Sequence, residues 1–183
     1  MDLERFKPES GSRGELHAQH LARYEFASRY TTGKRVVDAA CGAGYGSALL
    51  RRRGASSVTG IDLSEEAIAH AKEHYAAEGV DFLCGDIALL GTTGPADCVV
   101  SFETIEHLDD PETLLVPAHG VLGPGGLFIV STPVRRGGSL SDRPANPFHA
   151  REWNGGEFDN LLSRHFPVRR FFHQYVWRKR PYP

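Results

Sequence analysis

The sequence predicts an α/β fold with a doubly wound, mostly parallel sheet. Short apolar runs alternate with helical or loop segments along the chain, which is the pattern typical of parallel sheets. The first apolar run ends in an acid and opens directly into a glycine-rich turn, as expected where a buried strand leads into a helix. Five strands are expected, at residues 35–40, 57–62, 80–85, 97–102 and 126–132.

Helices are expected before and between these strands. The apolar side of Glu15–Tyr30 predicts a leading helix. The clearest helix starts after Ser64, whose hydroxyl suits an N-cap, and Gly79 is expected to stop it. A further helix begins at Asp110 and contains Pro117, so it is expected to be short or kinked.

The C-terminal third has a less regular pattern. Residues 122–126, with the sequence LGPGG, are interpreted as a turn that launches the fifth strand. A long loop is expected at Gly137–Pro147, and a sixth strand at Val168–Arg178. Too few residues follow for a seventh strand. Either that strand is absent, which leaves a sheet edge that needs cover, or the chain is truncated.

The composition fits one domain in the cytoplasm. A chain of 183 residues with 40% hydrophobic and 24% charged residues can bury a sizeable core. We expect residues 1–34 to form a helical cap region before a core at 35–183. No apolar run approaches the ~20 residues that span a bilayer, and the first residues lack the features of a signal peptide. The three cysteines have neither disulfide-framework nor zinc-site spacing: Cys41, Cys84 and Cys98.

The net charge of −2 hides an asymmetry. Residues 1–130 carry 11 basic and 19 acidic side chains, a net charge of −8, whereas residues 131–183 carry 10 and 4, a net charge of +6. The basic C-terminal third can attract an anionic substrate. A solvated basic face is the alternative, because the arginines are scattered and only Tyr175 and Trp177 lie near the terminal cluster. This distribution does not favour nucleic acid as a partner.

The glycine-rich turn is a candidate nucleoside-binding element. Gly42, Gly44 and Gly46 let the backbone turn sharply and approach a ligand. A dinucleotide fingerprint requires the order G-x-G-x-x-G, but from Gly42 the chain reads GAGYGS, so the third glycine comes one residue early. This displacement argues against NAD.

Acidic residues follow the first three strands, where ligands of open α/β sheets bind. Asp38 closes the first strand. Asp62 ends the second strand, and its carboxylate can accept hydrogen bonds from both hydroxyls of a ribose. Asp86 follows the third strand beside Ile87, so the acid can pair with an adenine amino group while the apolar side chain covers the ring. Together with the glycine turn, this ordered set predicts a nucleoside site.

These segments resemble, in order, the motifs of the class I S-adenosylmethionine-dependent methyltransferases. VVDAACGAGYGS is similar to the first motif, with Ala40 where many members have glycine. VTGIDLSEEAI resembles the ribose motif, and VDFLCGDI resembles the adenine motif. ADCVVSFETIEHLDDP and VLGPGGLFIVSTP resemble the motifs of the fourth and fifth strands, and the likeness extends over residues 15–175.

The resemblance implies a Rossmann-like sheet of the class I methyltransferase type and S-adenosylmethionine as cofactor. Within the family, the chain is most similar to bacterial enzymes that carry SFE-x-IEHL and NPFH-x-RE, here Ser101–Leu108 and Asn146–Glu152, and that often act on sugars, glycans or small metabolites. Val134 stands where asparagine is usual, so a polar group expected near the substrate is missing. The residues implied to contact the cofactor are Asp38, Ala40, Gly42, Gly44, Tyr45, Asp62, Leu63, Asp86, Ile87, Phe102 and Glu103.

Methyl transfer requires little from the protein, because the sulfonium of the cofactor is already activated. Glu103, Glu106 and His107 follow the fourth strand and are the candidate catalytic residues. His107 is the best candidate for a general base, since an ordinary histidine pKa of about 6.5 suits neutral pH. The alternative is that these side chains only fix the loop.

The same residues also have the composition of a metal site. Glu103, Glu106, His107 and the more distant His149 offer a mixed oxygen and nitrogen set that suits Mg, Mn or Zn. This set resembles that of metal-dependent RNA 3′-terminal 2′-O-methyltransferases. Many metal-free sugar methyltransferases share the E-x-x-E-H string, and the chain lacks an RNA-binding module, so no metal is assigned.

The sequence therefore predicts an enzyme that transfers a methyl group from S-adenosylmethionine to an oxygen, or a nitrogen, of a small sugar-like or anionic acceptor. The first alternative is the metal-dependent RNA methyltransferase. The second is a non-catalytic nucleoside-binding domain. No membrane partner is expected, and the oligomeric state is not predicted.

Overall fold

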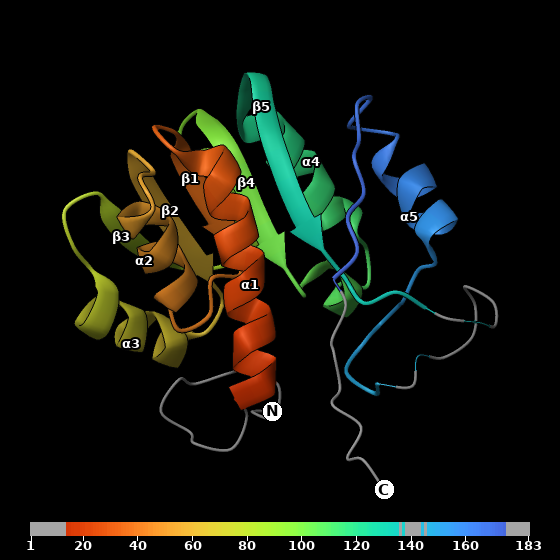
Figure 1. Ribbon diagram of the computed structural model, residues 1–183, viewed down its shortest axis with the longest axis horizontal. Coiled ribbons are helices and arrows are strands. Elements are labelled where there is room, and N and C mark those ends of the chain that lie inside the picture. The colour runs from red at the N-terminus through yellow and green to blue at the C-terminus, as the bar shows by residue number, and fades with distance from the viewer. Residues whose placement is uncertain (1–13, 136, 138–143, 145, 175–183) are drawn as a thin grey trace, which may run out of the picture.

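The five strands form one parallel sheet (Figure 1). The computed structural model describes residues 14–135, 137, 144 and 146–174, and its strands pair in the order β3-β2-β1-β4-β5. All neighbouring strands run parallel. Because β1 lies between β2 and β4, the direction of winding reverses between β1 and β4. The strand bounds are β1 Arg35–Ala39, β2 Ser57–Asp62, β3 Val80–Cys84, β4 Ala96–Phe102 and β5 Leu122–Ser131.

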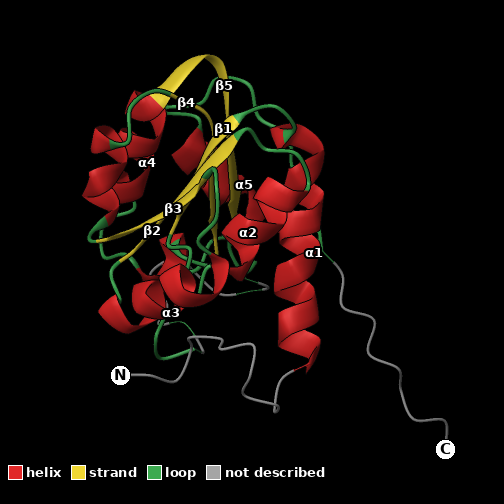
Figure 2. Ribbon diagram, turned by 90° about the vertical axis from the view of Figure 1, so that its left-hand side faces the viewer, coloured by secondary structure: helices red, strands yellow, loops and turns green. Residues whose placement is uncertain are grey.

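Helices cover both faces of this sheet (Figure 2). α1 and α2 lie on one face, and α4 lies on the other with the 3₁₀ helix η1. α5 lies beyond β5 (Figure 1). This coverage confirms the predicted doubly wound α/β fold. The helix bounds are α1 Gly14–Thr31, α2 Tyr45–Arg52, α3 Glu65–Tyr75, η1 Ile87–Thr92, η2 Ile105–His107, α4 Glu112–Val121 and α5 Gly155–Leu162.

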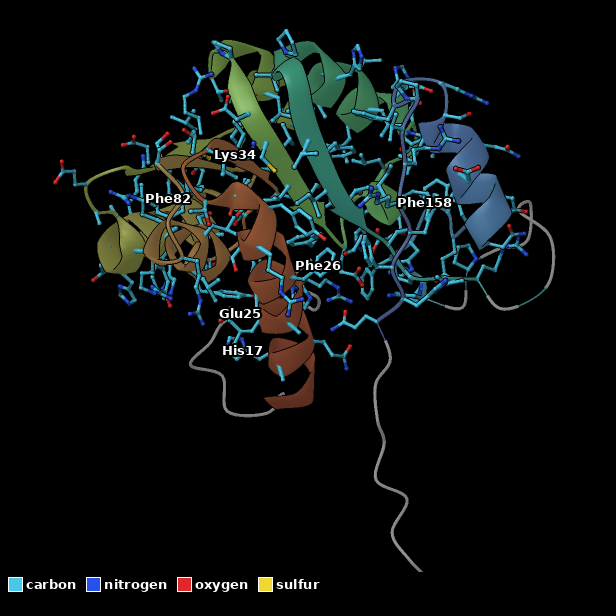
Figure 3. All side chains as sticks on the ribbon, turned by 45° about the horizontal axis from the view of Figure 1, so that its top comes forward. His17, Glu25, Phe26, Lys34, Phe82 and Phe158 are labelled. Carbon is cyan, nitrogen blue, oxygen red and sulfur yellow. The ribbon has the colours of Figure 1, made fainter. Side chains whose placement is uncertain are left out.

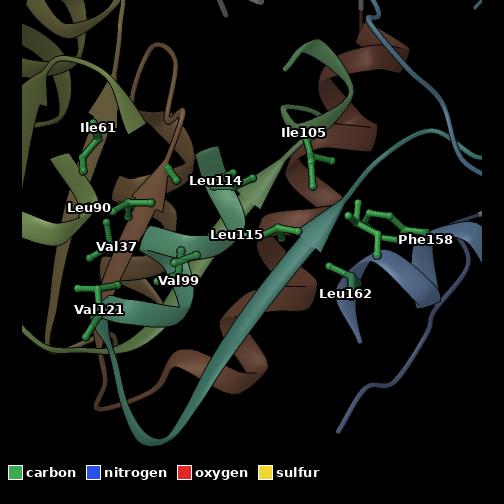
Figure 4. Packing of buried hydrophobic residues seen from close by; sticks show 14 of the residues in the cluster. Val37, Ile61, Leu90, Val99, Ile105, Leu114, Leu115, Val121, Phe158 and Leu162 are labelled. Atoms are coloured by element: carbon green, nitrogen blue, oxygen red, sulfur yellow. The ribbon is translucent and has the colours of Figure 1, made fainter. Parts of the chain in front are cut away.

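Alternate residues of the central strands supply two separate cores. Val37 and Val99 pack with residues of α4, η1 and α5 (Figure 4). Val36 and Val100 point to the opposite face and pack with residues of α1 and α2. Successive side chains of a strand point to opposite faces, so a strand with both faces covered is a continuous apolar run. This two-sided burial explains the unbroken hydrophobic segments in the sequence.

The start of α3 is as predicted, but its end is not. The Ser64 hydroxyl accepts a hydrogen bond from the Ala67 N–H at 3.2 Å, which confirms the N-cap. The helix ends at Tyr75, because Ala76 already has an extended backbone. Gly79 instead adopts a φ of 79° in the turn that leads into β3.

The expected turn at residues 122–126 is wrong, because these residues form the first half of β5. Ala96 pairs with Leu122, and Cys98 pairs with Leu127. Between these two pairs β5 advances five residues while β4 advances two, which is a bulge in the strand pair. The glycine-rich segment is therefore an irregularity inside a strand.

Pro117 does not end α4. The helix runs from Glu112 to Val121 and includes the proline in its interior. Leu114, Leu115 and other apolar residues of α4 are buried in the core. We attribute the persistence of the helix to this packing, which offsets the lost backbone hydrogen bond.

The expected sixth strand is wrong over its described part, because residues 168–174 form no strand, and residues 175–178 lie outside the described part of the chain. The Arg169 side chain donates instead to Asp159 of α5 at 2.6 Å. Phe172 packs on Phe26 of α1, with ring centroids 4.8 Å apart (Figure 3 labels Phe26). Residues 1–13 and most of the expected loop at 137–147 also lie outside the described residues. No described helix combines the length and the apolar composition that crossing a bilayer requires.

Candidate functional site

The candidate site lies at the carboxyl ends of the strands, around the reversal between β1 and β4. Two residues adopt left-handed backbone conformations there: Ala40 follows β1 with a φ of 63°, and Glu103 follows β4 with a φ of 52°. They are the only non-glycine residues with positive φ in the described part of the chain. Such conformations cost about 1–3 kcal/mol and concentrate at functional sites. The φ of Ala40 also explains why glycine suits this position.

The three glycines of the turn differ in their surroundings. A Cβ on Gly46 would lie 2.0 Å from the Tyr24 ring, and a Cβ on Gly44 would lie 2.8 Å from Phe82. Packing within the protein therefore requires these two glycines. A Cβ on Gly42, which has a φ of 55°, would meet nothing within 4 Å. Gly42 is thus the position where the turn faces open space.

Asp38 is fully buried near the end of β1. Its carboxylate accepts a hydrogen bond from the Ser47 hydroxyl of α2 at 2.6 Å and another from the Tyr24 hydroxyl of α1 at 3.2 Å. Burial raises the pKa of Asp38 to about 7, although both hydrogen bonds act in the opposite direction. Asp38 therefore ties β1 to two helices and supports the glycine turn. Its contact with a cofactor stays a prediction.

Asp62 connects the glycine turn to α3. One carboxylate oxygen accepts from the Gly42 N–H at 2.8 Å, and the other accepts from the Ser64 N–H at 2.9 Å. Next to it, the apolar side chain of Leu63 is 67% exposed. The arrangement places a rigid carboxylate and an exposed apolar surface side by side at the end of β2.

Asp86 and Ile87 lie at the adjacent end of β3. The Gly85 N–H donates to the Asp62 carbonyl at 3.0 Å, so the two strand ends are in contact. Asp86 is exposed and caps η1 by accepting from the Ala88 N–H at 2.9 Å. Ile87 is half-buried against the core. The structure thus brings together the ends of β2 and β3, which carry two of the acids that the sequence predicted for the nucleoside.

Aromatic side chains connect α1 to the strand ends. The Tyr24 ring lies 4.9 Å from that of Phe102 and 6.0 Å from that of Tyr45, measured between centroids. The ring of His17, about two helical turns before Tyr24 in α1, lies 5.2 Å from that of Tyr45. Tyr45 and Phe102 therefore lie in one aromatic cluster with α1, and aromatic packing accounts for at least part of their role.

Glu103 is held by two partners at the end of β4. The Ser131 hydroxyl donates to one carboxylate oxygen at 2.7 Å, and Arg23 of α1 lies 3.2 Å from the other. Both charged side chains are mostly buried. Sequence reasoning missed this ion pair, because nothing in the pattern relates a residue of the leading helix to one 80 positions later. The pair fixes α1 over the site.

Glu106, His107 and His149 form a second cluster. Ligand atoms from all three side chains lie within 4.8 Å of one another, whereas Glu103 is not part of this group. Glu106 is completely buried, and neither of its carboxylate oxygens makes a well-formed hydrogen bond to a described residue. Burial, together with the charge of Glu103, raises the pKa of Glu106 to about 8, although hydrogen bonds from its backbone and from Thr132 and the charge of Arg23 act in the opposite direction.

The segment around His149 is tied to this cluster by its backbone. The N–H groups of Ala150 and Arg151 both donate to the Glu106 carbonyl, at 2.8 and 3.2 Å. The His149 Nδ1 lies 2.7 Å from a carboxylate oxygen of Glu152. Glu152 had no predicted role of its own, and its place in the NPFH-x-RE string was the only signal that pointed to it.

The chain belongs to the family described as "Methyltransferase domain", whose match covers residues 37–130. This segment contains both the glycine turn and the β4 turn described above. One curated relative, in Mycolicibacterium smegmatis, is named "Probable S-adenosylmethionine-dependent methyltransferase"; it is 39% identical over 147 residues, which are 79% of this chain and 56% of the relative. Another, the ubiquinone biosynthesis O-methyltransferase of Idiomarina loihiensis, is 36% identical over 124 residues, 64% of this chain and 51% of the relative.

The fold also matches solved structures. An S-adenosylmethionine-dependent methyltransferase from Mesorhizobium loti superposes with a TM-score of 0.62 at 25% identity, over 80% of this chain and 82% of that one. The chain spans little more than half the length of the two curated relatives, 56% and 51%. The sheet is therefore that of a class I methyltransferase, whereas features of the remaining halves of those relatives do not transfer.

Proposed function

We propose that this chain transfers a methyl group from S-adenosylmethionine to an oxygen, or a nitrogen, of a small acceptor. The observation that carries the proposal is the position of Asp62. Its carboxylate lies 2.8 Å from the N–H of Gly42, the one glycine of the turn that faces open space, and beside the exposed Leu63. A carboxylate, an open backbone turn and an apolar surface together suit the ribose and base of a nucleoside.

The residues at this edge fit the cofactor. Each oxygen of Asp62 accepts one backbone N–H and keeps a further lone pair for a ribose hydroxyl. Asp86 is exposed and available to an adenine amino group, with Ile87 beside it to cover the ring. Asp38 and Phe102 complete the predicted contacts from β1 and β4.

S-adenosylmethionine supplies a methyl group that is already activated by its sulfonium. The chain's own residues have to orient the acceptor and receive its proton. We propose His107 as the general base that receives the proton of the acceptor. Its Nδ1 lies 2.9 Å from the carbonyl oxygen of Phe148, which can only accept, so Nδ1 carries the hydrogen and the neutral ring keeps a lone pair on Nε2. Glu103 and Glu106 are then positioning residues around this base.

The name of the Idiomarina relative, an O-methyltransferase, supports oxygen as the acceptor atom. A sugar-like acceptor remains part of the proposal. The E-x-x-E-H and NPFH-x-RE strings, which resemble those of enzymes that act on sugars, both contribute residues to the Glu106–His107–His149 cluster. An anionic acceptor has less support, because several arginines of the basic third are already paired with acids. These pairs are Arg135–Glu157, Arg164–Glu112 and Arg169–Asp159.

The two alternatives are less favoured. The curated relatives are named as methyltransferases, which favours catalysis over nucleoside binding alone. Neither of these two relatives is named for RNA. Arginines that are already paired with acids do not favour a surface that binds RNA. One domain and a cytoplasmic location are kept as predictions.

Thermal unfolding with S-adenosylhomocysteine tests the cofactor. We expect the product to raise the melting temperature of the wild type and to leave that of Asp62→Ala unchanged. A panel of hydroxyl acceptors with methyl-labelled S-adenosylmethionine then tests transfer. If S-adenosylhomocysteine does not stabilise the wild type, the cofactor assignment fails. If it binds but no acceptor is methylated, the alternative of a non-catalytic nucleoside-binding domain gains support.

A further inference from the structure

The Glu106–His107–His149 cluster has an unusual electrostatic feature. The Glu106 side chain is completely buried, and neither of its carboxylate oxygens makes a well-formed hydrogen bond to a described residue. The uncharged polar groups that act on it are the Thr132 hydroxyl and the Glu106 backbone N–H. A buried polar group without a partner costs about 1–3 kcal/mol, and more when it is charged. Arg23, the cationic side chain whose charge acts on Glu106, makes its ion pair with Glu103 instead. Glu106 therefore has no ion pair of its own among the described residues, whereas buried carboxylates normally have one.

Both histidines of the cluster are oriented by acceptors on their far side. The Nδ1 of His107 lies 2.9 Å from the Phe148 carbonyl oxygen, and the Nδ1 of His149 lies 2.7 Å from the Glu152 carboxylate. Both partners are acceptors, so each Nδ1 carries the hydrogen. The lone pair of each neutral ring is then on Nε2. Metal-binding histidines are held in the same way, with the second nitrogen donating to a carbonyl or a carboxylate.

The hydrogen bond to Asn146 agrees with this assignment. The Asn146 side-chain nitrogen lies 2.9 Å from the Nε2 of His149, and its oxygen accepts from the Phe148 N–H at 3.0 Å. The amide therefore donates to Nε2, which must be the unprotonated nitrogen. A cation has the same preference for this lone pair and would replace the amide there.

We propose that Glu106, His107 and His149 bind one divalent cation, Zn²⁺ or Mn²⁺. Ligand atoms from the three side chains lie within 4.8 Å of one another, so a small adjustment lets one ion reach all three. One carboxylate and two imidazoles suit such cations, and three protein ligands leave coordination positions open. On the proposed function, an open position would hold the oxygen of the acceptor. With the ion bound, the Nε2 of His107 would be a ligand instead of the base proposed above, and the ion would lower the pKa of the acceptor hydroxyl so that its proton passes to solvent. The class of acceptor is then a hydroxyl compound rather than an amine.

The backbone around the cluster brings the ligands together without a metal. The Glu106 carbonyl accepts from both the Ala150 and Arg151 N–H groups, which brings the His149 segment to the β4 turn across more than 40 residues. Two of the three ligands are thus placed by hydrogen bonds that do not involve the metal. A site assembled from two segments in this way is preorganised for an ion.

Calorimetric titration of the chelator-treated full chain with ZnCl₂, and separately with MnCl₂, tests the proposal. We expect about one ion per chain with a micromolar or lower Kd for at least one of these ions. Glu106→Gln should weaken binding by about 100-fold or more, and Glu152→Gln by about 10- to 100-fold through the orientation of His149. Circular dichroism has to show that both variants are folded.

His70→Gln is the matched control. The His70 and His74 rings lie 4.1 Å apart on α3, so this pair is the obvious place for adventitious binding. We expect His70→Gln to leave the Kd unchanged. Absence of binding by the wild type, or loss of binding in His70→Gln while Glu106→Gln binds normally, would overturn the site.

A parallel titration with S-adenosylhomocysteine separates this inference from the proposed function. If the nucleoside binds to the metal-free chain and neither metal binds, the cation site is wrong and the proposed function stands. If a metal binds at this cluster and the nucleoside does not bind, the cation site stands and the proposed function fails.

Discussion

The two halves of the strand-end edge satisfy their polar groups in different ways. On the side of β1, β2 and β3, the acids bond to the chain itself: both oxygens of Asp62 accept backbone N–H groups, and Asp38 accepts two hydroxyls. On the side of β4, Glu106 is equally buried, but its carboxylate makes no well-formed hydrogen bond to a described residue, and the uncharged polar groups that act on it are the Thr132 hydroxyl and its own backbone N–H. In the first half, the fold itself supplies hydrogen bonds to the acids. In the second half, the proposed cation would supply the missing partner of Glu106.

This difference indicates how the two halves respond to change. The hydrogen bonds of the first half hold the glycine turn and the starts of α2 and α3, so its residues affect folding and nucleoside affinity together. The Glu106 cluster makes few bonds that the fold requires. Its substitution is expected to alter binding of the metal and the acceptor while the fold persists.

The largest effect is expected for Gly46→Ala. A Cβ would lie 2.0 Å from the buried Tyr24 ring, which also bonds to Asp38. We expect a loss of about 3 kcal/mol in the free energy of unfolding, because a filled core has no room for the methyl group. Urea unfolding measures it.

Gly42→Ala is the control for this prediction. Its Cβ would meet nothing within 4 Å, so only the strain of its positive φ remains, about 1 kcal/mol. Equal losses in the two variants would contradict the division of the turn into packed and open glycines.

A smaller effect is expected in the pH dependence of stability. Burial raises the pKa of Asp38 from its ordinary 3.8 to about 7, so the folded chain holds this proton more tightly than the unfolded chain does. The contribution is full below pH 3.8 and is lost as the pH rises through about 7. Between pH ~5 and pH ~6.5 this group should lower the free energy of unfolding by about 2 kcal/mol. Asp38→Asn should remove that decrease.

Asp97→Asn provides the comparison. Hydrogen bonds from Arg35 lower the pKa of Asp97 to about 2, so this exposed acid does not titrate in the same window. Unfolding curves measured at several pH values give both slopes. Parallel pH profiles for Asp38→Asn and the wild type would contradict the assignment.

The smallest effect concerns the ion pair that joins the two halves through α1. Arg23 and Glu103 are 16% and 21% exposed, whereas Arg53 and Glu25, also on α1, are 57% and 42% exposed. Arg23→Gln is expected to lower the free energy of unfolding by about 1 kcal/mol, and Arg53→Gln by less, because solvent screens the outer pair. Chemical denaturation at low and high salt checks the order. A larger loss for Arg53→Gln would show that burial does not strengthen the inner pair.

The strands and the polar residues at their ends were predictable, because they depend on local patterns. Apolar runs in the sequence identify β1 to β4, and Ser64 followed by two glutamates identifies the start of α3. The glycine-rich start of β5 was not predictable from local rules. Its residues favour a turn, and only pairing with β4 turns that preference into a bulge.

On the side of β4, only the types of the site residues were predictable. His107 lies next to Glu106 in the sequence, but the approach of His149 depends on backbone bonds between distant segments. The same holds for Arg23 and Glu103, which meet because α1 crosses the end of β4. The prediction of a sixth strand was wrong for a related reason. Arg169 donates a hydrogen bond to Asp159, and Phe172 packs on Phe26, and these contacts depend on distant segments.

The most direct test of the account is calorimetric titration of S-adenosylhomocysteine into three folded proteins: the wild type, Asp62→Asn and Glu106→Gln. The account predicts that the wild type and Glu106→Gln bind with Kd values that agree within about twofold. Asp62→Asn should bind about 100-fold more weakly, because it loses charge-assisted hydrogen bonds to the ribose. Absence of binding by the wild type, or equal affinity of the wild type and Asp62→Asn, would contradict it.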